Sequence, residues 1–115
     1  MADKRNIHFG EDPYVEFLEL ELALARNELW EATKGERGVQ ADFTGKDLRG
    51  RNFLGANLQK AILKGANLSG VDLSYSDLSG ANLCRANLTG ANLTGANLDN
   101  ALLAGAILAG AKGIV

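Results

Sequence analysis

A gapless five-residue repeat is the feature that most constrains the fold of this 115-residue chain. It runs from Ala41 to Gly110 as fourteen units, and the centre of each unit is Leu in twelve and Phe in two. The residue two positions before the centre is Ala in ten units, and the residue directly before it is Asn or Asp in eleven. The last position is Gly in ten units. Because an internal repeat sets the architecture, it is interpreted before any single element.

An apolar residue at every fifth position fits neither a helix nor a straight strand. At 100° per residue, successive leucines would spiral over every side of an α-helix. In a straight strand, a step of five residues would put successive leucines on opposite faces. Within one unit, however, Ala and Leu are two residues apart and can share one face of a short extended segment. All leucines then share one interior only if the chain turns once per unit, where Gly permits a positive φ. The spacing therefore predicts a solenoid with short extended walls.

The units Ala86-Asn87-Leu88-Thr89-Gly90 and Ala91-Asn92-Leu93-Thr94-Gly95 resemble the A(D/N)LXX motif of the pentapeptide-repeat family. The resemblance covers residues 41–110. It implies an all-β solenoid, a right-handed quadrilateral β-helix with four units per coil, so that fourteen units make about 3.5 coils. In that fold the first coil is residues 41–60, and the C-terminal coil is residues 95–114.

The chain divides into an N-terminal segment with a helix, residues 1–38, and the solenoid, residues 39–115. Asp12-Pro13 is typical of a helix start, and we expect a helix over about 13–33 that ends near Gly35. We expect this helix to be an N-terminal capping α-helix, because the end of a repeat column otherwise exposes open strand edges and apolar side chains. Lys46 and Arg51 occupy inward positions, so we expect both to turn towards the helix and pair with Glu21, Glu28 or Glu31.

The expected helix carries two apolar stripes. The first has heptad spacing and consists of Val15, Leu18, Leu22, Ala25, Leu29 and Ala32. The second consists of Phe17, Leu20 and Leu24. Packing on the domain's own core explains one stripe, and we expect it to be the first. Either a loop or residues 1–11 cover the second stripe, or it forms a surface for a second chain.

The C-terminal coil departs from the repeat in a different way. Leu102 and Ile107 replace Asn or Asp, and Ala104 and Ala109 occupy the next outward positions. Exposed apolar residues beside open edges favour association. Some members of the family dimerise through the C-terminal coil, so the resemblance implies a homodimer here. The expected self-association residues are Leu102, Ala104, Ile107, Ala109 and Ile114. The alternative is that residues 112–115 fold back as a plug.

Outward residues that differ from Gly, Ser and Thr are the candidates for a surface that binds a protein partner of unknown identity. They are Leu54, Gln59, Lys60, Ile62, Lys64, Tyr75, Arg85 and Asp99. The candidate partner surface combines the second helix stripe with Lys60, Ile62, Lys64, Tyr75 and Arg85. Four units per turn would place Lys64 and Arg85 on one face, which is modestly basic.

The sequence gives no sign of an active site or of a cofactor or metal site. Its only histidine is His8, and its only cysteine, Cys84, is at an outward position, so it has neither an internal disulfide nor a cysteine-based zinc site. The glycines come singly at corners and form no phosphate-binding loop. No apolar run suits a signal peptide or membrane insertion, so we expect a reducing cytoplasm.

These observations predict a non-enzymatic structural or protein–protein interaction module. The alternative is regulation of a nucleic-acid enzyme by DNA mimicry, because the family includes acidic proteins that protect gyrase. Residues 1–40 carry five Lys/Arg against nine Asp/Glu, a net −4, whereas residues 41–115 carry seven against five, a net +2. Such a column is too short and too little negative for mimicry, and direct nucleic-acid binding is not expected either. The family's abundance in cyanobacteria suggests a bacterial source and a third hypothesis, a membrane- or photosynthesis-associated assembly factor.

Overall fold

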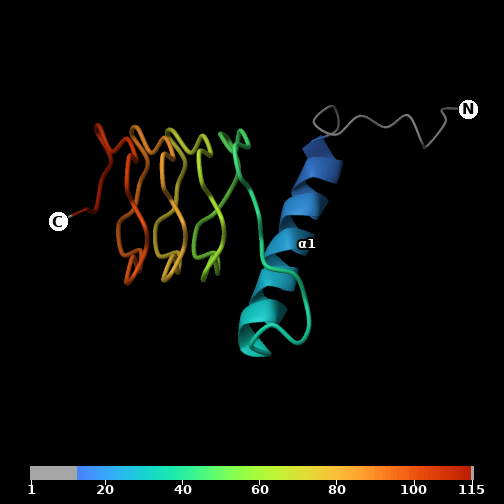
Figure 1. Ribbon diagram of the computed structural model, residues 1–115. Coiled ribbons are helices and arrows are strands. Elements are labelled where there is room, and N and C mark those ends of the chain that lie inside the picture. Colours follow the sequence, from blue (N-terminus) through green and yellow to red (C-terminus); the bar gives the residue numbers. More distant parts are fainter. Residues whose placement is uncertain (1–12, 115) are drawn as a thin grey trace, which may run out of the picture.

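The computed structural model describes residues 13–114, which form one helix and a solenoid (Figure 1). Residues 1–12 and 115 lie outside the described part, and so do His8 and the irregular segment expected over residues 1–11. Helix α1 spans Pro13–Ala32, one residue shorter than expected. It begins at Pro13, which suits a first helical position, and Glu16 lies in its first turn, where an acid favours the helix dipole.

The C-terminus of α1 is closed by two backbone hydrogen bonds. The amide of Gly35 donates to the carbonyl of Trp30 at 2.8 Å, and the amide of Lys34 donates to the carbonyl of Glu31 at 3.2 Å. Lys34 itself has a φ of 55°, in the left-handed region. This is the Schellman arrangement, in which a left-handed residue directly after the helix lets two carbonyls find partners.

The solenoid is held together by parallel pairing at every fifth residue. Eleven isolated bridges join residues twenty apart, from Asp42 with Ile62 to Asn92 with Lys112, and no strand in residues 13–114 is longer than one bridge residue. Twenty residues are four units, so the register agrees with four units per coil. Figure 1 shows the coils stacked side by side, with α1 at one end and the C-terminal coil at the other.

Each unit ends in a tight turn. In the first unit, the amide of Lys46 donates to the carbonyl of Phe43 at 3.0 Å, and Gly45 between them has a φ of 68°. A positive φ at the third residue alone defines a type II turn. Four corners carry residues other than Gly in the same left-handed conformation. They are Lys60, Tyr75, Arg85 and Asn100, with φ of 58° to 61°.

The core is one column of inward Leu and Ala side chains. The central leucines from Leu58 to Leu88 are fully buried, and Phe43 and Leu48 at the start of the column are each 6% exposed. The two phenylalanines, Phe43 and Phe53, meet edge to face with centroids 6.4 Å apart. At the other end Leu98, Leu103 and Leu108 are only partly buried. The column is therefore covered at its beginning and open at its C-terminal coil.

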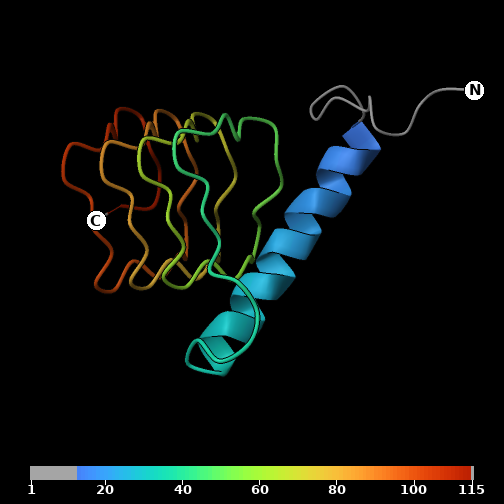
Figure 2. The same cartoon turned by 45° about the vertical axis from the view of Figure 1, so that its right-hand side comes forward.

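Helix α1 runs diagonally across the end of the first coil (Figure 2). Leu20 belongs to the core, with 8% of its surface exposed, and Ala23 and Leu24 pack against it. The prediction that the heptad stripe packs on the core is therefore wrong. The shorter stripe faces the solenoid, and the heptad stripe is mostly exposed. Of the stripe expected to be left over, only Phe17 is exposed. Asn27, which is fully buried, lies on the same side of α1 as Leu20 and Ala23. Within the described residues, no helix is both long and apolar enough to cross a membrane.

Candidate functional site

Asn27 joins α1 to the open edge of the first coil. Its side chain is fully buried, its Nδ2 donates to the carbonyl of Gln59 at 3.0 Å, and its Oδ1 accepts from the amide of Ala41 at 2.9 Å. Gln40 acts similarly, donating from Nε2 to the carbonyl of Lys60 at 2.7 Å. The Asn27 side chain thereby satisfies two backbone groups for which no preceding coil exists. Sequence reasoning missed Asn27, although an Asn inside a helix rich in Ala, Leu and Glu is a signal, because Asn lowers helix propensity.

Two ion pairs lie beside this anchor, and they differ from the expected ones. Arg51 does turn towards α1, but its partner is Glu16, and both side chains are largely buried. Glu31 pairs instead with Lys60 at 3.2 Å. Lys46 is exposed and forms no ion pair within residues 13–114. The expected partners Glu21 and Glu28 therefore contact neither cation, because they lie on the side of α1 away from the solenoid.

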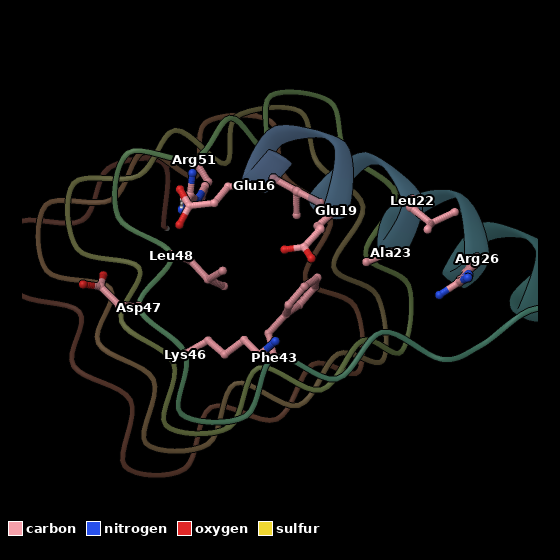
Figure 3. Close-up of a pocket in the computed structure, with 11 residues that line it drawn as sticks. Glu16, Glu19, Leu22, Ala23, Arg26, Phe43, Lys46, Asp47, Leu48 and Arg51 are labelled. Atoms are coloured by element: carbon pink, nitrogen blue, oxygen red, sulfur yellow. Dashed lines mark hydrogen bonds and ion pairs between the residues drawn. The ribbon is translucent and has the colours of Figure 1, made fainter. Parts of the chain in front are cut away.

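A groove of about 530 Å³ remains between α1 and the first coil (Figure 3). Figure 3 shows Phe43 and Leu48 pointing into the opening, with Glu16 and Glu19 on α1 above it. Its charged rim mixes both signs and consists of Glu16, Glu19, Arg26, Lys46, Asp47 and Arg51. The hydrogen bond from Arg49 lowers the pKa of Asp47 to about 2, so this rim carboxylate stays ionised. No group of three or more potential metal ligands occurs in the described part of the chain.

The outward candidates do not form one site. Ile62 lies in the ladder between Asp42 and Asn82, and it is partly buried. Lys64 and Arg85 are exposed on the same side of the column, because the amide of Gly65 donates to the carbonyl of Cys84. Lys60 is held by α1, as described above.

Tyr75 lies on a different corner and is 68% exposed. Its ring covers Gly95, one coil further on, where an added Cβ would come within 2.5 Å of the ring. The same relation joins Lys60 to Gly80 and Arg85 to Gly105, with added-Cβ distances of 3.1 Å and 3.2 Å. A left-handed residue other than Gly costs about 1–2 kcal/mol in backbone strain, so these side chains occupy costly positions.

The C-terminal coil exposes the residues named for self-association. Leu102 is 55% exposed, Ile107 is 51% exposed and Ile114 is 40% exposed. Ala104 and Ala109 are also exposed. Lys112 continues the ladder by bridging to Asn92, so residues up to 112 extend the column and do not fold back over its end.

Pentapeptide repeat proteins are found among the solved structures similar to this chain. Rfr23 from the cyanobacterium Cyanothece 51142 shares 38% identity over 65% of this chain and 56% of its own, with a TM-score of 0.49. A protein from the Arabidopsis thaliana thylakoid lumen shares 34% over 62% of this chain and 63% of its own, with a TM-score of 0.37. A third, from Nostoc PCC 7120, shares 35% over 71% of each chain, with a TM-score of 0.37.

The chain spans less than two thirds of the length of the first two of these structures. No curated protein sequence matches it. The family model for pentapeptide repeats matches residues 39–70, 52–90, 66–105 and 86–112, with eight copies. Together these matches cover well over half of the sequence and imply a right-handed β-helical solenoid. The chain therefore belongs to the pentapeptide-repeat family.

Proposed function

We propose that this protein is a non-enzymatic structural and protein–protein interaction module. The observation that carries the proposal is the replacement of Asn or Asp by Leu102 and Ile107, whose side chains are more than half exposed on the C-terminal coil. Large exposed apolar side chains gathered at one end of a column favour a protein interface. In this proposal α1 is the N-terminal cap, and the C-terminal coil is the self-association surface.

Replacing Leu102 and Ile107 by the Asn that is usual at this repeat position tests the C-terminal coil as the self-association surface. A variant with Leu102→Asn and Ile107→Asn keeps the column, because Asn occupies the same position in the units before it. Light scattering after size exclusion is expected to show self-association for the parent chain and the mass of a single chain, 12.2 kDa, for the variant. Leu54→Asn is the matched control, because Leu54 is also 55% exposed but lies in the first coil. An unchanged mass in the double variant would remove the C-terminal coil from the proposal.

Tyr75 is the best candidate for contact with a different protein. Exposed tyrosines are frequent among residues that dominate interface energies, and Gly at this corner would avoid the backbone strain. Tyr75→Gly is therefore expected to stabilise the fold by about 1 kcal/mol while reducing the recovery of a partner from the source organism. Full recovery with a more stable fold would show that Tyr75 takes no part in binding.

The proposal assigns no catalytic residue. The groove beside α1 has rim charges of both signs and an apolar floor, and no Ser, Thr, Cys or His is among its described lining residues. DNA mimicry stays the alternative, but its requirement for a long, strongly negative column is not met by a solenoid of net charge +2 over residues 41–115. Inhibition of gyrase supercoiling by the purified protein would reverse this preference.

A further inference from the structure

Helix α1 has two apolar faces, and the solenoid of its own chain uses only one. Its inner face consists of Leu20, Ala23 and Leu24 around the buried Asn27. The outer stripe consists of Leu18, Leu22 and Leu29, which are 47%, 49% and 40% exposed. With 3.6 residues per turn, Leu18 lies about 180° from Asn27. The outer stripe therefore lies on the far side of α1 from Asn27, with Leu22 also at the edge of the groove beside the first coil.

The C-terminal coil is the second uncovered apolar surface. Its core leucines, Leu98, Leu103 and Leu108, are only partly buried, and their amides have no hydrogen-bond partner among the described residues. In the coil before, the equivalent amides of Leu83 and Leu88 donate to the carbonyls of Leu102 and Ile107 at 2.8 Å and 2.7 Å. The end of the column thus lacks both the apolar cover and the polar partners that α1 gives to the first coil.

The unpaired polar groups of these two surfaces are complementary. Helix α1 carries five Glu and one Arg, a net −4. The C-terminal coil contains Lys112 and Asp99, a net charge of 0, and it offers donors, in Lys112 and in the amides of its core leucines that lack an acceptor among the described residues. At the first coil α1 already pairs its acids with solenoid cations, in Glu16 with Arg51 and Glu31 with Lys60. Glu21 and Glu28, which flank the outer stripe, are exposed and form no ion pair with residues 13–114.

We propose that the outer stripe of α1 in one copy covers the C-terminal coil of a second copy, so that the helix lies between two solenoids. This inference rests on the proposed function and names the surface that the C-terminal coil binds. One contact buries both uncovered surfaces at once. Pairing of two C-terminal coils would leave the outer stripes exposed, and pairing of two outer stripes would bring together two helices of net charge −4.

A contact between two different surfaces has a specific consequence for assembly. Each copy keeps a free outer stripe at one end and a free C-terminal coil at the other, so the contact does not close into a dimer. The mass of the parent chain is therefore expected to rise with protein concentration beyond that of two chains. Tail-to-tail pairing, by contrast, would stop at two.

Two variants that each block one surface test the proposal. Leu18→Glu with Leu22→Glu makes the outer stripe charged at two positions that are about half exposed. Ala106→Glu blocks the C-terminal coil. Ala106 is in the same column as Lys46, whose long side chain at this inward position turns out of the first coil and is exposed. Far-UV circular dichroism and urea unfolding check that both variants keep the parent fold.

Each variant alone is expected to have the mass of one chain, 12.2 kDa, in light scattering. Their equimolar mixture is expected to give twice that mass and nothing larger, because each copy then has one working surface. Ala106→Lys is the matched control and should associate like the parent chain, since a cation there faces the acidic helix.

Other outcomes overturn the inference in distinguishable ways. A self-associated outer-stripe variant would mean that C-terminal coils pair with each other, which leaves the proposed function standing. A self-associated Ala106→Glu variant would mean that helices pair with helices. A mixture of the two variants that stays at the mass of one chain would show that the surfaces do not meet. A parent chain that is monomeric at every concentration would overturn both the inference and the proposed self-association.

Discussion

The two ends of the solenoid are built from the same repeat but are completed differently. At the N-terminal end, Leu48 is 6% exposed and backbone groups of the first coil bond to Asn27. At the C-terminal end, Leu108 occupies the same column three coils later, is partly buried, and has no partner for its amide in the described part of the chain. A repeat specifies its own interior but not its ends, because each coil draws half of its contacts from a neighbour.

The difference also shows what a cap must supply. Apolar cover alone would leave the amide of Ala41 and the carbonyl of Gln59 buried without partners, which is costly. Helix α1 meets both needs by placing a buried amide side chain among its apolar residues. At the C-terminal coil, the described residues supply no acceptor for the amides of Leu98, Leu103 and Leu108.

Asn27→Leu is expected to have the largest effect on stability, because it removes the side chain that joins α1 to two backbone groups of the first coil. Two buried backbone groups lose their partners, and the free energy of unfolding is expected to fall by about 3 kcal/mol. Urea denaturation measures this loss. Asn97→Ala is the control, because Asn97 is exposed and accepts only from the amide of Asp99, at 2.9 Å; it should cost about 1 kcal/mol. Equal losses for the two would mean that apolar packing alone holds α1.

Leu48→Ala and Leu108→Ala compare the two ends directly. Leu48→Ala, at the covered end, is expected to lower the free energy of unfolding by about 3 kcal/mol. Leu108→Ala, at the partly exposed end, should lower it by about 1 kcal/mol. Both are measured by urea unfolding at low protein concentration. If association covers the C-terminal coil, the cost of Leu108→Ala should increase as the concentration is raised. Equal costs in the dilute protein would contradict the picture of one covered and one open end.

Acidification is expected to have the smallest effect on the stability of the fold, and to lower mainly the stability of the N-terminal half of the solenoid. The pKa of Asp42 is lowered by the hydrogen bond from Thr44, that of Asp72 by the hydrogen bond from Ser74, and that of Asp47 to about 2 by Arg49. A pKa lowered in the folded state adds stability above the unfolded value, and this is lost as pH falls through the folded value. Stability should therefore decline slightly between about pH 4 and pH 2.

Asp47→Asn sharpens this test, because Asn57 makes the same bond to the amide of Gln59 without a charge. The variant should lose less stability than the parent chain on acidification in urea unfolding. A parent chain whose stability does not change down to pH 2 would show that these hydrogen bonds do not influence the folding equilibrium.

The interior and the corners of the solenoid were predictable because they repeat. The spacing of Leu and Ala requires one turn per unit. Because the pattern recurs in fourteen units, single departures such as Val71, which stands at an Ala position, do not obscure it. The family match and the register of twenty residues support this part of the prediction. Helix α1 lies beside the first coil, and its role as a cap stays a prediction.

The rotation of α1 was not predictable from its apolar stripes. Both stripes are hydrophobic, and the heptad stripe is longer, so burial alone favours the wrong one. The polar requirement of the coil edge decides the outcome, because only one rotation places Asn27 against Ala41 and Gln59. The partner of Arg51 follows from that rotation, which brings Glu16 and not Glu21 or Glu28 to the coil.

A long side chain at a corner lies over the same corner of the next coil, and this limits how closely large side chains can follow one another along the column. Tyr75 lies so close over Gly95 that a side chain does not fit there, whereas the contact of Arg85 with an added Cβ at Gly105 is tight and needs only a small shift. With coils about 4.8 Å apart, recognition groups along the Tyr75 corner can recur no closer than about 10 Å. An engineer who wants a denser row must use neighbouring corners or the flat walls between them.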